Sequence, residues 1–312
     1  MWEFHNNQMK ELREVYNSLS SSKQKELQKI VKGFNASNIN EMTTNKSLLN
    51  EYVKKWKSKG ILKGNFNVLV LNLLNRPAIY NIDMLHILIT GTYYEFMAKA
   101  EERERPILEE DIKHYYEEAQ TEVIKKTNKG TLSKITDAML IGILLMANAQ
   151  GYKLADYKDV YVSEVVQKFE EMLFPLINEG KEIDLGSTAF QKEFDKELNT
   201  LISINGDKIS GTIDNYMIGF LNEAKKKGYE AQDKDAKVRF IAVEDEKTTP
   251  MCHSLDGQEF YVNRENVYTR YYGVDKKMGY EATMRTQGLV VGENMPPIDN
   301  YFHYCRSTIE YI

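Results

Sequence analysis

The feature that most constrains the fold is a change of pattern at Gly228. Before it, apolar side chains recur every three to four positions, as in Met9, Leu12 and Tyr16, and this spacing predicts amphipathic helices. After it, residues 238–243 alternate and are rich in β-branched and aromatic side chains, which is typical of a strand. The sequence therefore predicts an α+β protein, in which a predominantly helical body precedes a small C-terminal α+β module with short antiparallel strands.

Glycine, proline and serine residues divide this pattern into elements. Helices are expected over residues 2–34 with a break at Ser20–Ser22, 48–56, 79–104, 109–126, from Thr131 or Ser133 to about 150, 157–176, 187–204 and 208–227. Pro106 and Gly228 are expected to end two of these helices. Residues 66–74 fit a buried strand or a buried helix, and periodicity cannot decide between them. We predict a helical body over residues 1–186 and a module over residues 187–312.

Short strands are expected in the module. They lie at residues 238–243, 258–262, 288–291 and 308–312. Asp256 and Gly257 stand between apolar positions, which is a hairpin-type turn signal. The glutamates and aspartate at 109–111 are expected to occupy the first turn of a helix, where negative charge is favoured by the helix dipole.

Composition excludes some classes of protein. The 312 residues are 42% hydrophobic and carry a formal net charge of −5, so the whole chain has no electrostatic footprint for nucleic acid. No apolar run is long enough for a membrane segment. Two cysteines in a chain of this length do not make a disulfide framework, which favours a reducing compartment.

Both cysteines lie in two C-terminal segments that also hold two histidines. Cys252, His303 and Cys305 are the candidate ligands for zinc, because thiolates and imidazoles from two distant segments form a common zinc layout. The spacing is irregular, since His253 adjoins Cys252 and only one residue separates His303 from Cys305. The alternative is two small buried cysteines facing each other, with hydrogen-bonded histidines. A catalytic Cys252 thiolate would need a positioned base that the sequence does not identify.

Other charged groups have weaker signals. Candidate metal-binding spacings on helices are Glu110, His114 and Glu118, and Asp83 with His86. A solvated helix face produces such spacings often. The run Lys225–Lys227 could contact a phosphate, but cations are also favoured at a helix C-terminus. A bidentate pair between Asp256 and Arg306 would hold the two C-terminal segments together.

The order of these C-terminal residues resembles the phage head morphogenesis family, the Mu F-like minor head proteins. The resemblance rests on Cys252, Leu255, Asp256, Gly257 and Phe260, then Pro296 and Pro297, then Cys305, Arg306, Ser307, Thr308 and Ile309. It covers about the last hundred residues, and the family module normally follows a helix and a strand. The chain departs from the family pattern at Thr249, where many members have cysteine, and in the spacing around His303. Both departures weaken the zinc assignment.

The resemblance implies a non-enzymatic minor structural protein of a tailed-phage head or prophage. Its expected partners are the portal and capsid proteins of the same phage, with DNA contact during packaging or ejection as a further expectation. The expected locations are the virion and, during assembly, the host cytoplasm. The structural motif would be Leu255, Asp256, Gly257, Pro296, Pro297 and Arg306. Two alternatives stay open, namely a Cys/His or metal-dependent hydrolase and a DNA-binding ejection factor.

Overall fold

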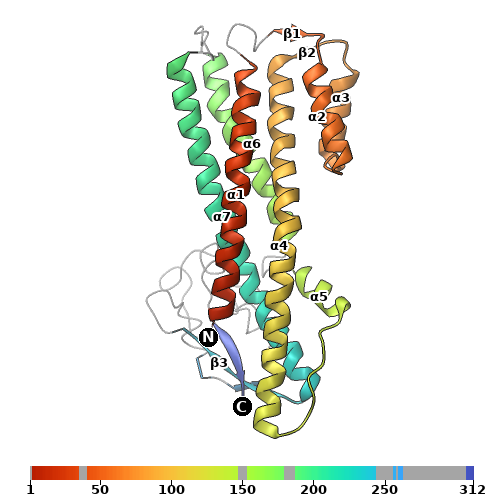
Figure 1. Ribbon diagram of the computed structural model, residues 1–312, viewed down its shortest axis with the longest axis vertical. Coiled ribbons are helices and arrows are strands. Elements are labelled where there is room, and N and C mark those ends of the chain that lie inside the picture. Colours follow the sequence, from red (N-terminus) through yellow and green to blue (C-terminus); the bar gives the residue numbers. More distant parts are fainter. Residues whose placement is uncertain are drawn as a thin grey trace, which may run out of the picture. The chain divides into compact units, whose positions relative to one another are not determined.

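The protein is mostly helical, with a few short antiparallel strands in two small sheets, which confirms the predicted fold class (Figure 1). The computed structural model describes residues 2–34, 41–146, 153–178, 187–243, 256–257, 259–262 and 307–312. The helices are α1 (Glu3–Lys32), α2 (Ser47–Ser58), α3 (Gly64–Asn75), α4 (Asn81–Thr127), α5 (Asp137–Leu144), α6 (Leu154–Asn178) and α7 (Thr188–Gln232). The strands are β1 (Met42–Thr43), β2 (Ile79–Tyr80), β3 (Lys237–Ile241), β4 (Glu259–Tyr261) and β5 (Thr308–Tyr311).

The chain forms two compact units, each assembled from separate stretches. Unit 1 contains residues 1–9, 106–154 and 209–312, and unit 2 contains residues 10–105 and 155–208. The domain boundary predicted after residue 186 falls at the end of a stretch, 179–186, that lies outside the described residues. That division of the chain stays a prediction.

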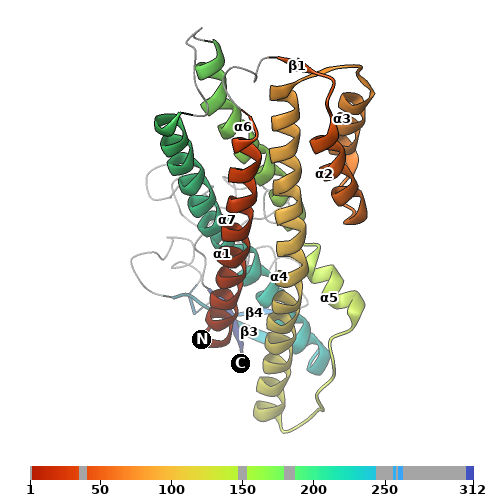
Figure 2. The same cartoon turned by 45° about the horizontal axis from the view of Figure 1, so that its top comes forward.

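In unit 2, α2 and α3 lie side by side along the N-terminal half of α4 (Figure 2). Trp56 of α2 is fully buried. Its ring packs directly against Gly91 of α4 and fills the space that a side chain at that position would need. Phe66 of α3 packs against Trp56 and against Tyr94 of α4, with ring centroids 5.5 and 5.1 Å away. The ambiguous stretch 66–74 is therefore helical, and its buried residues Phe66, Val70 and Leu73 have helical spacing.

In unit 1, a three-stranded antiparallel sheet in the order β4-β3-β5 packs against α4 and α7. Val238 of the central strand pairs with Phe260 of β4 and Tyr311 of β5. The core of this unit combines residues from both helices and all three strands or their ends: Ala119, Val123, Tyr229, Ala236, Val238, Val262, Ile309 and Tyr311. The predicted strands at 238–243, 258–262 and 308–312 are confirmed, while the one at 288–291 lies outside the described residues.

Three predicted helix breaks are wrong, and one of them is the gap between residues 204 and 208, which α7 spans without interruption. Helix α1 continues through Ser20 and Ser21, whose hydroxyls donate to the carbonyl of Asn17 and so leave the helix intact. Helix α4 continues through Pro106, and Ile107 and Leu108 directly after it are buried. Burial of apolar residues on both sides of the proline outweighs the one backbone hydrogen bond that proline removes.

The prediction that Gly228 ends a helix is also wrong, because α7 runs on to Gln232. A Cβ atom at Gly228 would lie 2.4 Å from the carbonyl oxygen of Tyr116 and 2.8 Å from the Cβ of Ala119. The glycine therefore permits α7 to approach the backbone of α4 closely. Its role is packing between two helices of unit 1, whereas the sequence suggested a terminus.

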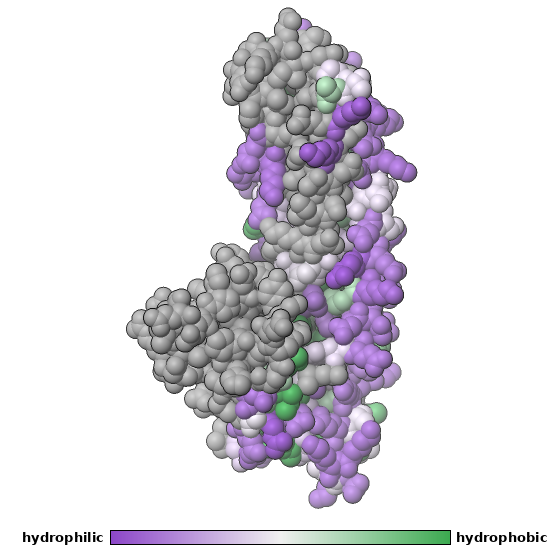
Figure 3. Space-filling view, turned by 90° about the vertical axis from the view of Figure 1, so that its left-hand side faces the viewer, coloured by the Kyte–Doolittle hydropathy of each residue, from purple (hydrophilic) through white to green (hydrophobic). Residues whose placement is uncertain are grey.

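The face shown in Figure 3 is mostly hydrophilic among its coloured residues. Scattered hydrophobic residues on such a surface are normal for a globular protein. Within the part of the chain that the structure describes, no helix combines the length and the apolar character needed to cross a bilayer.

Candidate functional site

The predicted motif residues Asp256 and Gly257 lie at the turn before β4. The Asp256 Oδ1 accepts a hydrogen bond from the backbone N–H of Ala242 at 2.8 Å, and the Gly257 N–H donates to the carbonyl of Phe240 at 2.9 Å. Gly257 has φ +73°, a conformation that side chains disfavour. Both residues therefore fix the backbone beside the end of β3. This geometry assigns them a structural role in the module.

The remaining motif residues lie outside the described residues. They are the candidate zinc ligands Cys252, His303 and Cys305, and the motif residues Leu255, Pro296, Pro297 and Arg306. Zinc binding and the ion pair between Asp256 and Arg306 stay predictions. Among the residues that are described, no group of three or more His, Cys, Asp or Glu side chains is placed to hold a metal ion.

A polar seam joins the last strand of the module to α4 and α7. One Glu122 oxygen accepts the Tyr229 hydroxyl at 2.6 Å, and the other accepts the backbone N–H of Tyr311 at 3.0 Å. The Tyr311 hydroxyl donates to Asp233 at 2.9 Å. Burial and the Glu122 carboxylate raise the pKa of Tyr229 well above its ordinary value, so the phenol keeps its proton. The seam fixes the register of β5 on the helices.

The run Lys225–Lys227 does not form a basic face within the described part of unit 1. Lys225 is buried, its Nζ lies 3.5 Å from the Thr308 hydroxyl, and burial lowers its pKa. The Lys226 Nζ lies 3.6 Å from Glu230, and the Lys227 Nζ lies 3.0 Å from the same residue. The observation that would have favoured a DNA-binding ejection factor, an unpaired basic surface at this run, is therefore missing from these residues.

The weak metal candidates on helices have other partners. His86 Nε2 lies 3.1 Å from Glu170, while Asp83 lies 3.5 Å from Arg76, so the two do not face one ion together. The ring of His114 stacks on Phe4, with centroids 4.0 Å apart and an angle of 16° between the planes. Stacking and ion pairing account for these residues without a metal.

A cluster that sequence reasoning missed surrounds His5 in unit 1. The His5 Nδ1 lies 2.6 Å from an Asp111 oxygen, and the Nε2 lies 2.7 Å from an Asp214 oxygen. His5 and Asp111 are buried, whereas the Asp214 side chain is 43% exposed. Three helical segments of the unit, from α1, α4 and α7, thus meet at one imidazole.

The electrostatics show that this imidazole is a cation. Burial alone lowers the pKa of His5, but hydrogen bonds from the ring to Asp111 and Asp214 outweigh it and raise the pKa to about 9. Burial raises the pKa of Asp111, and the His5 charge opposes that effect. Both ring nitrogens already have carboxylate partners, so the ring offers no lone pair to a metal or a substrate. The cluster is built to clamp helices.

A second cluster missed by sequence reasoning surrounds Glu95 in unit 2. This glutamate of α4 is 1% exposed, and its carboxylate lies 3.0 Å from Lys23, 2.8 Å from Lys55 and 2.5 Å from Lys59. Burial alone raises the pKa of Glu95, but the hydrogen bonds from the lysines prevail and lower it to about 2. Glu26 shares Lys23 and Lys55, at 2.6 and 2.5 Å. The cluster joins α1, α2 and α4.

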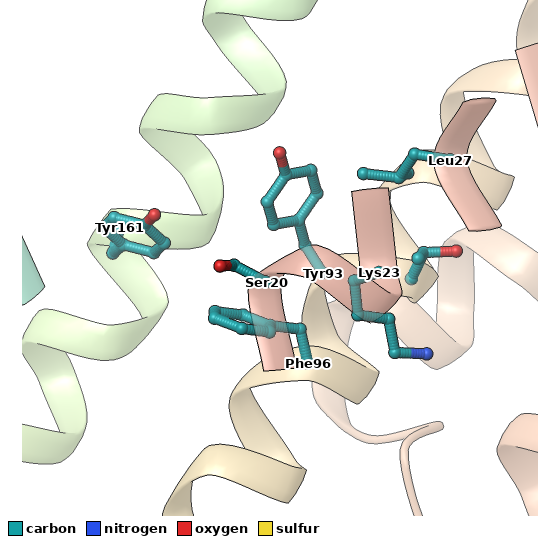
Figure 4. A pocket seen from close by; sticks show the side chains of 7 residues that line it. Ser20, Lys23, Leu27, Tyr93, Phe96 and Tyr161 are labelled. Atoms are coloured by element: carbon teal, nitrogen blue, oxygen red, sulfur yellow. The ribbon is translucent and has the colours of Figure 1, made fainter. Parts of the chain in front are cut away.

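A shallow pocket lies beside this cluster and is lined by α1, α4 and α6 (Figure 4). The lining residues are Ser20, Lys23, Leu27, Thr92, Tyr93, Phe96 and Tyr161. Its water-accessible volume is ≈ 10 Å³, which holds about one water molecule and is far below the range for small-molecule sites. Lys23 is already engaged by Glu95. The buried Tyr93 hydroxyl has no hydrogen-bond partner in the described structure. Nothing in this lining pairs a nucleophile with a base.

Sequence signals for the two clusters exist but are weak. His5 shares the buried stripe of α1 with Trp2, Met9 and Leu12, and a polar residue on such a stripe needs a partner. Asp111 was expected in the first turn of a helix, which is wrong because α4 continues through Pro106. The partners are 106 and 209 positions away from His5, so no local pattern could identify them.

Comparisons with protein-family models, with curated proteins and with solved structures found no match to this chain.

Proposed function

We propose that this chain is a minor structural protein of a tailed-phage head or prophage that associates with the portal. The observation that supports the proposal most directly is the use of Asp256 and Gly257 as backbone-fixing groups beside β3. A long helix and a strand precede this turn, which is the order the resemblance implies.

The clusters outside the module also favour a structural role. The buried ionic clusters around His5 and Glu95 pair their cations with carboxylates, while Asp111 Oδ1 is buried without a hydrogen-bond partner in the described residues. Neither leaves a group positioned to attack a substrate. Each cluster ties together helices of its own unit, and such internal ties suit a structural component of a large assembly.

Co-expression with the portal protein encoded in the same genome tests the proposal. We expect the chain to co-purify with an affinity-tagged portal and to appear in native mass spectra as added mass on the portal ring. The major capsid protein of that genome, tagged in the same way, is the comparison bait. If the folded chain elutes from the portal sample only at its own mass, portal association is wrong.

Zinc is a separate proposal for the same module. Native mass spectrometry with and without a chelator would detect an ion held by Cys252, His303 and Cys305. A bound zinc that the chelator removes, and that a Cys305→Ala variant lacks, would support the site. A metal-free spectrum of the folded chain would contradict it.

A further inference from the structure

The helical hairpin at residues 41–81, here called the α2–α3 arm, has an unusual distribution of charge. It is closed at its base by β1 and β2, where Met42 pairs with Tyr80 and Thr43 pairs with Ile79. Its basic residues are Lys46, Lys54, Lys55, Lys57, Lys59, Lys63 and Arg76. Glu41 and Glu51 are the acidic residues of the arm, so residues 41–81 have a formal charge of +5 in a chain of −5. The rest of the chain is therefore strongly acidic, and the arm is its basic counterpart.

Helix α3 of the arm exposes apolar side chains on its outer side, beside the exposed asparagines Asn65 and Asn72. Val68, Leu69 and Leu71 are 54%, 52% and 48% exposed. Its twelve residues include no charged side chain. Exposed apolar side chains that gather on one side of a helix mark a candidate contact surface.

Two further exposed apolar residues lie at the base of the arm. Met42 and Tyr80, which face each other across the β1–β2 ladder, are both exposed. A tyrosine with one apolar and one polar end is typical of boundaries between an apolar phase and water. The exposed apolar residues of the arm thus span α3 and the small sheet beside it.

Several of the arm's lysines remain available. Lys55 and Lys59 reach Glu95, and Lys46 donates to backbone carbonyls at the end of α3. Lys54, Lys57 and Lys63 are exposed and form no ion pair within the described residues. A charge-free apolar helix therefore lies next to lysines whose charge the structure does not neutralise.

The pattern selects among possible occupants of this surface. A second copy of the chain would bring another basic arm against the first, which like-charge repulsion opposes. Nucleic acid would meet the lysines but would leave the apolar side chains in water. A single partner helix covers a narrow stripe, whereas Val68, Leu69 and Leu71 spread over roughly 160° at 3.6 residues per turn. A lipid interface surrounds every exposed side of an inserted helix, and anionic lipids attract lysines.

We propose that the α2–α3 arm binds the surface of an anionic lipid bilayer. The side chains of Val68, Leu69 and Leu71 enter the boundary between headgroups and acyl chains, and Lys54 and Lys57 meet lipid phosphates. The protein lies on the membrane through this arm and does not cross it. This inference is independent of the portal association proposed above.

Flotation of the purified full-length chain with lipid vesicles tests the inference. One set of vesicles is phosphatidylcholine alone, and the other contains an equal amount of phosphatidylglycerol. We expect binding to the anionic vesicles, weakening with added salt, and no binding to the neutral ones. Replacing Lys54, Lys57 and Lys63 by Gln removes three charges and is expected to weaken binding roughly a hundredfold, at about fivefold for each lysine.

A Val68→Asn/Leu71→Asn variant tests the apolar contribution, with an expected loss of roughly tenfold. The matched control is Leu132→Asn/Leu145→Asn, because these leucines of unit 1 are 59% and 55% exposed but lie outside the arm. The control is expected to bind as the wild type does. Circular dichroism confirms that every variant is folded before its binding is compared.

Several results would overturn the inference. One is a folded wild type that stays unbound with anionic vesicles, and another is undiminished binding by both arm variants. Sedimentation that reveals a dimer, converted to monomer by Val68→Asn/Leu71→Asn, would assign the surface to self-association. DNA binding that needs the lysines but not Val68 and Leu71, without vesicle binding, would assign it to nucleic acid.

Discussion

The two units bury ionic groups in opposite arrangements. In unit 1 one cation, His5, lies between two carboxylates. In unit 2 one buried carboxylate, Glu95, lies among four lysines, two of which also pair with Glu26. The central group is almost fully buried in both cases. The difference teaches that the sign of the buried charge matters less than the number of its partners, because removing a charge from water is costly unless several opposite charges compensate.

The largest expected effect is in unit 2. Glu95→Gln keeps the shape of the side chain but removes the carboxylate that Lys23, Lys55 and Lys59 share, so the buried Lys23 retains only Glu26 as a partner. We expect the free energy of unfolding to fall by about 4 kcal/mol, measured by urea denaturation. Glu51→Gln on exposed α2 is the control and should change it by less than about 0.5 kcal/mol. If both substitutions lower the free energy of unfolding equally, burial of the Glu95 cluster contributes nothing to stability.

The next effect is in unit 1 and depends on pH. The folded-state pKa of His5, about 9, lies above its ordinary value of 6.5, so protonation favours the folded protein. The stabilisation is complete below pH 6.5 and is lost as the pH rises through 9. The two pKa values correspond to about 3 kcal/mol. Denaturation curves across this range should show the decline, and a His5→Gln variant should lack it.

The half-exposed His86 supplies the control for the pH experiment. It pairs with a single glutamate, Glu170, in unit 2. His86→Gln should leave the decline between pH 6.5 and 9 intact. A decline of the same size in His5→Gln would mean that another group titrates and that the His5 cluster does not carry the charge assigned to it.

A smaller effect is expected when the packing between two helices of unit 1 is changed and the charges are kept. Gly228→Ala places a Cβ against the carbonyl of Tyr116 and the methyl of Ala119, so the two helices must move apart. We expect a loss of about 2 kcal/mol in unfolding free energy. Gly211→Ala, on the same helix, meets nothing within 4 Å and should stabilise the protein by about 0.5 kcal/mol. Thermal denaturation measures both variants. Melting temperatures that shift in the same direction would contradict the close approach of α7 to α4 at Gly228.

The smallest expected effect is in the C-terminal module. Asp256→Ala removes the acceptor of the Ala242 N–H and should cost about 1 kcal/mol, because the side chain is exposed and water replaces it in part. Asp256→Asn retains an acceptor and should restore most of the loss. The measurement is again the free energy of unfolding. An Asp256→Ala variant that is as stable as the wild type would contradict the structural role assigned to this residue.

Local patterns predicted much of the fold. The strand at β3 and the turn at Asp256–Gly257 follow from alternation and turn chemistry, and the helical character of α1, α4, α6 and α7 follows from apolar spacing. The boundaries at Ser20–Ser22, Pro106 and Gly228 did not follow. Each of these residues has a local preference for ending a helix, which burial against other elements overrides.

The candidate functional residues also fall into two groups, those with a local sequence signal and those whose partners lie far away in the chain. Asp256 and Gly257 are adjacent, so their turn could be predicted from the chain, but their hydrogen bonds to Ala242 and Phe240, 14 and 17 residues earlier, could not. His5 and Glu95 depend on partners that reach them from other helices. No periodicity encodes such a pairing, because a lysine or aspartate on one helix is compatible with many neighbours.

By itself, the sequence of this protein determined the class of fold, the strands of the module and the residues able to form its turn, because these depend on the order of nearby side chains. Only the tertiary structure decided that helices continue through proline and glycine, that His5 is held as a cation and that α3 keeps an exposed apolar side. Those outcomes depend on which distant surfaces meet. The free energy of burial is a property of that contact and not of any segment alone.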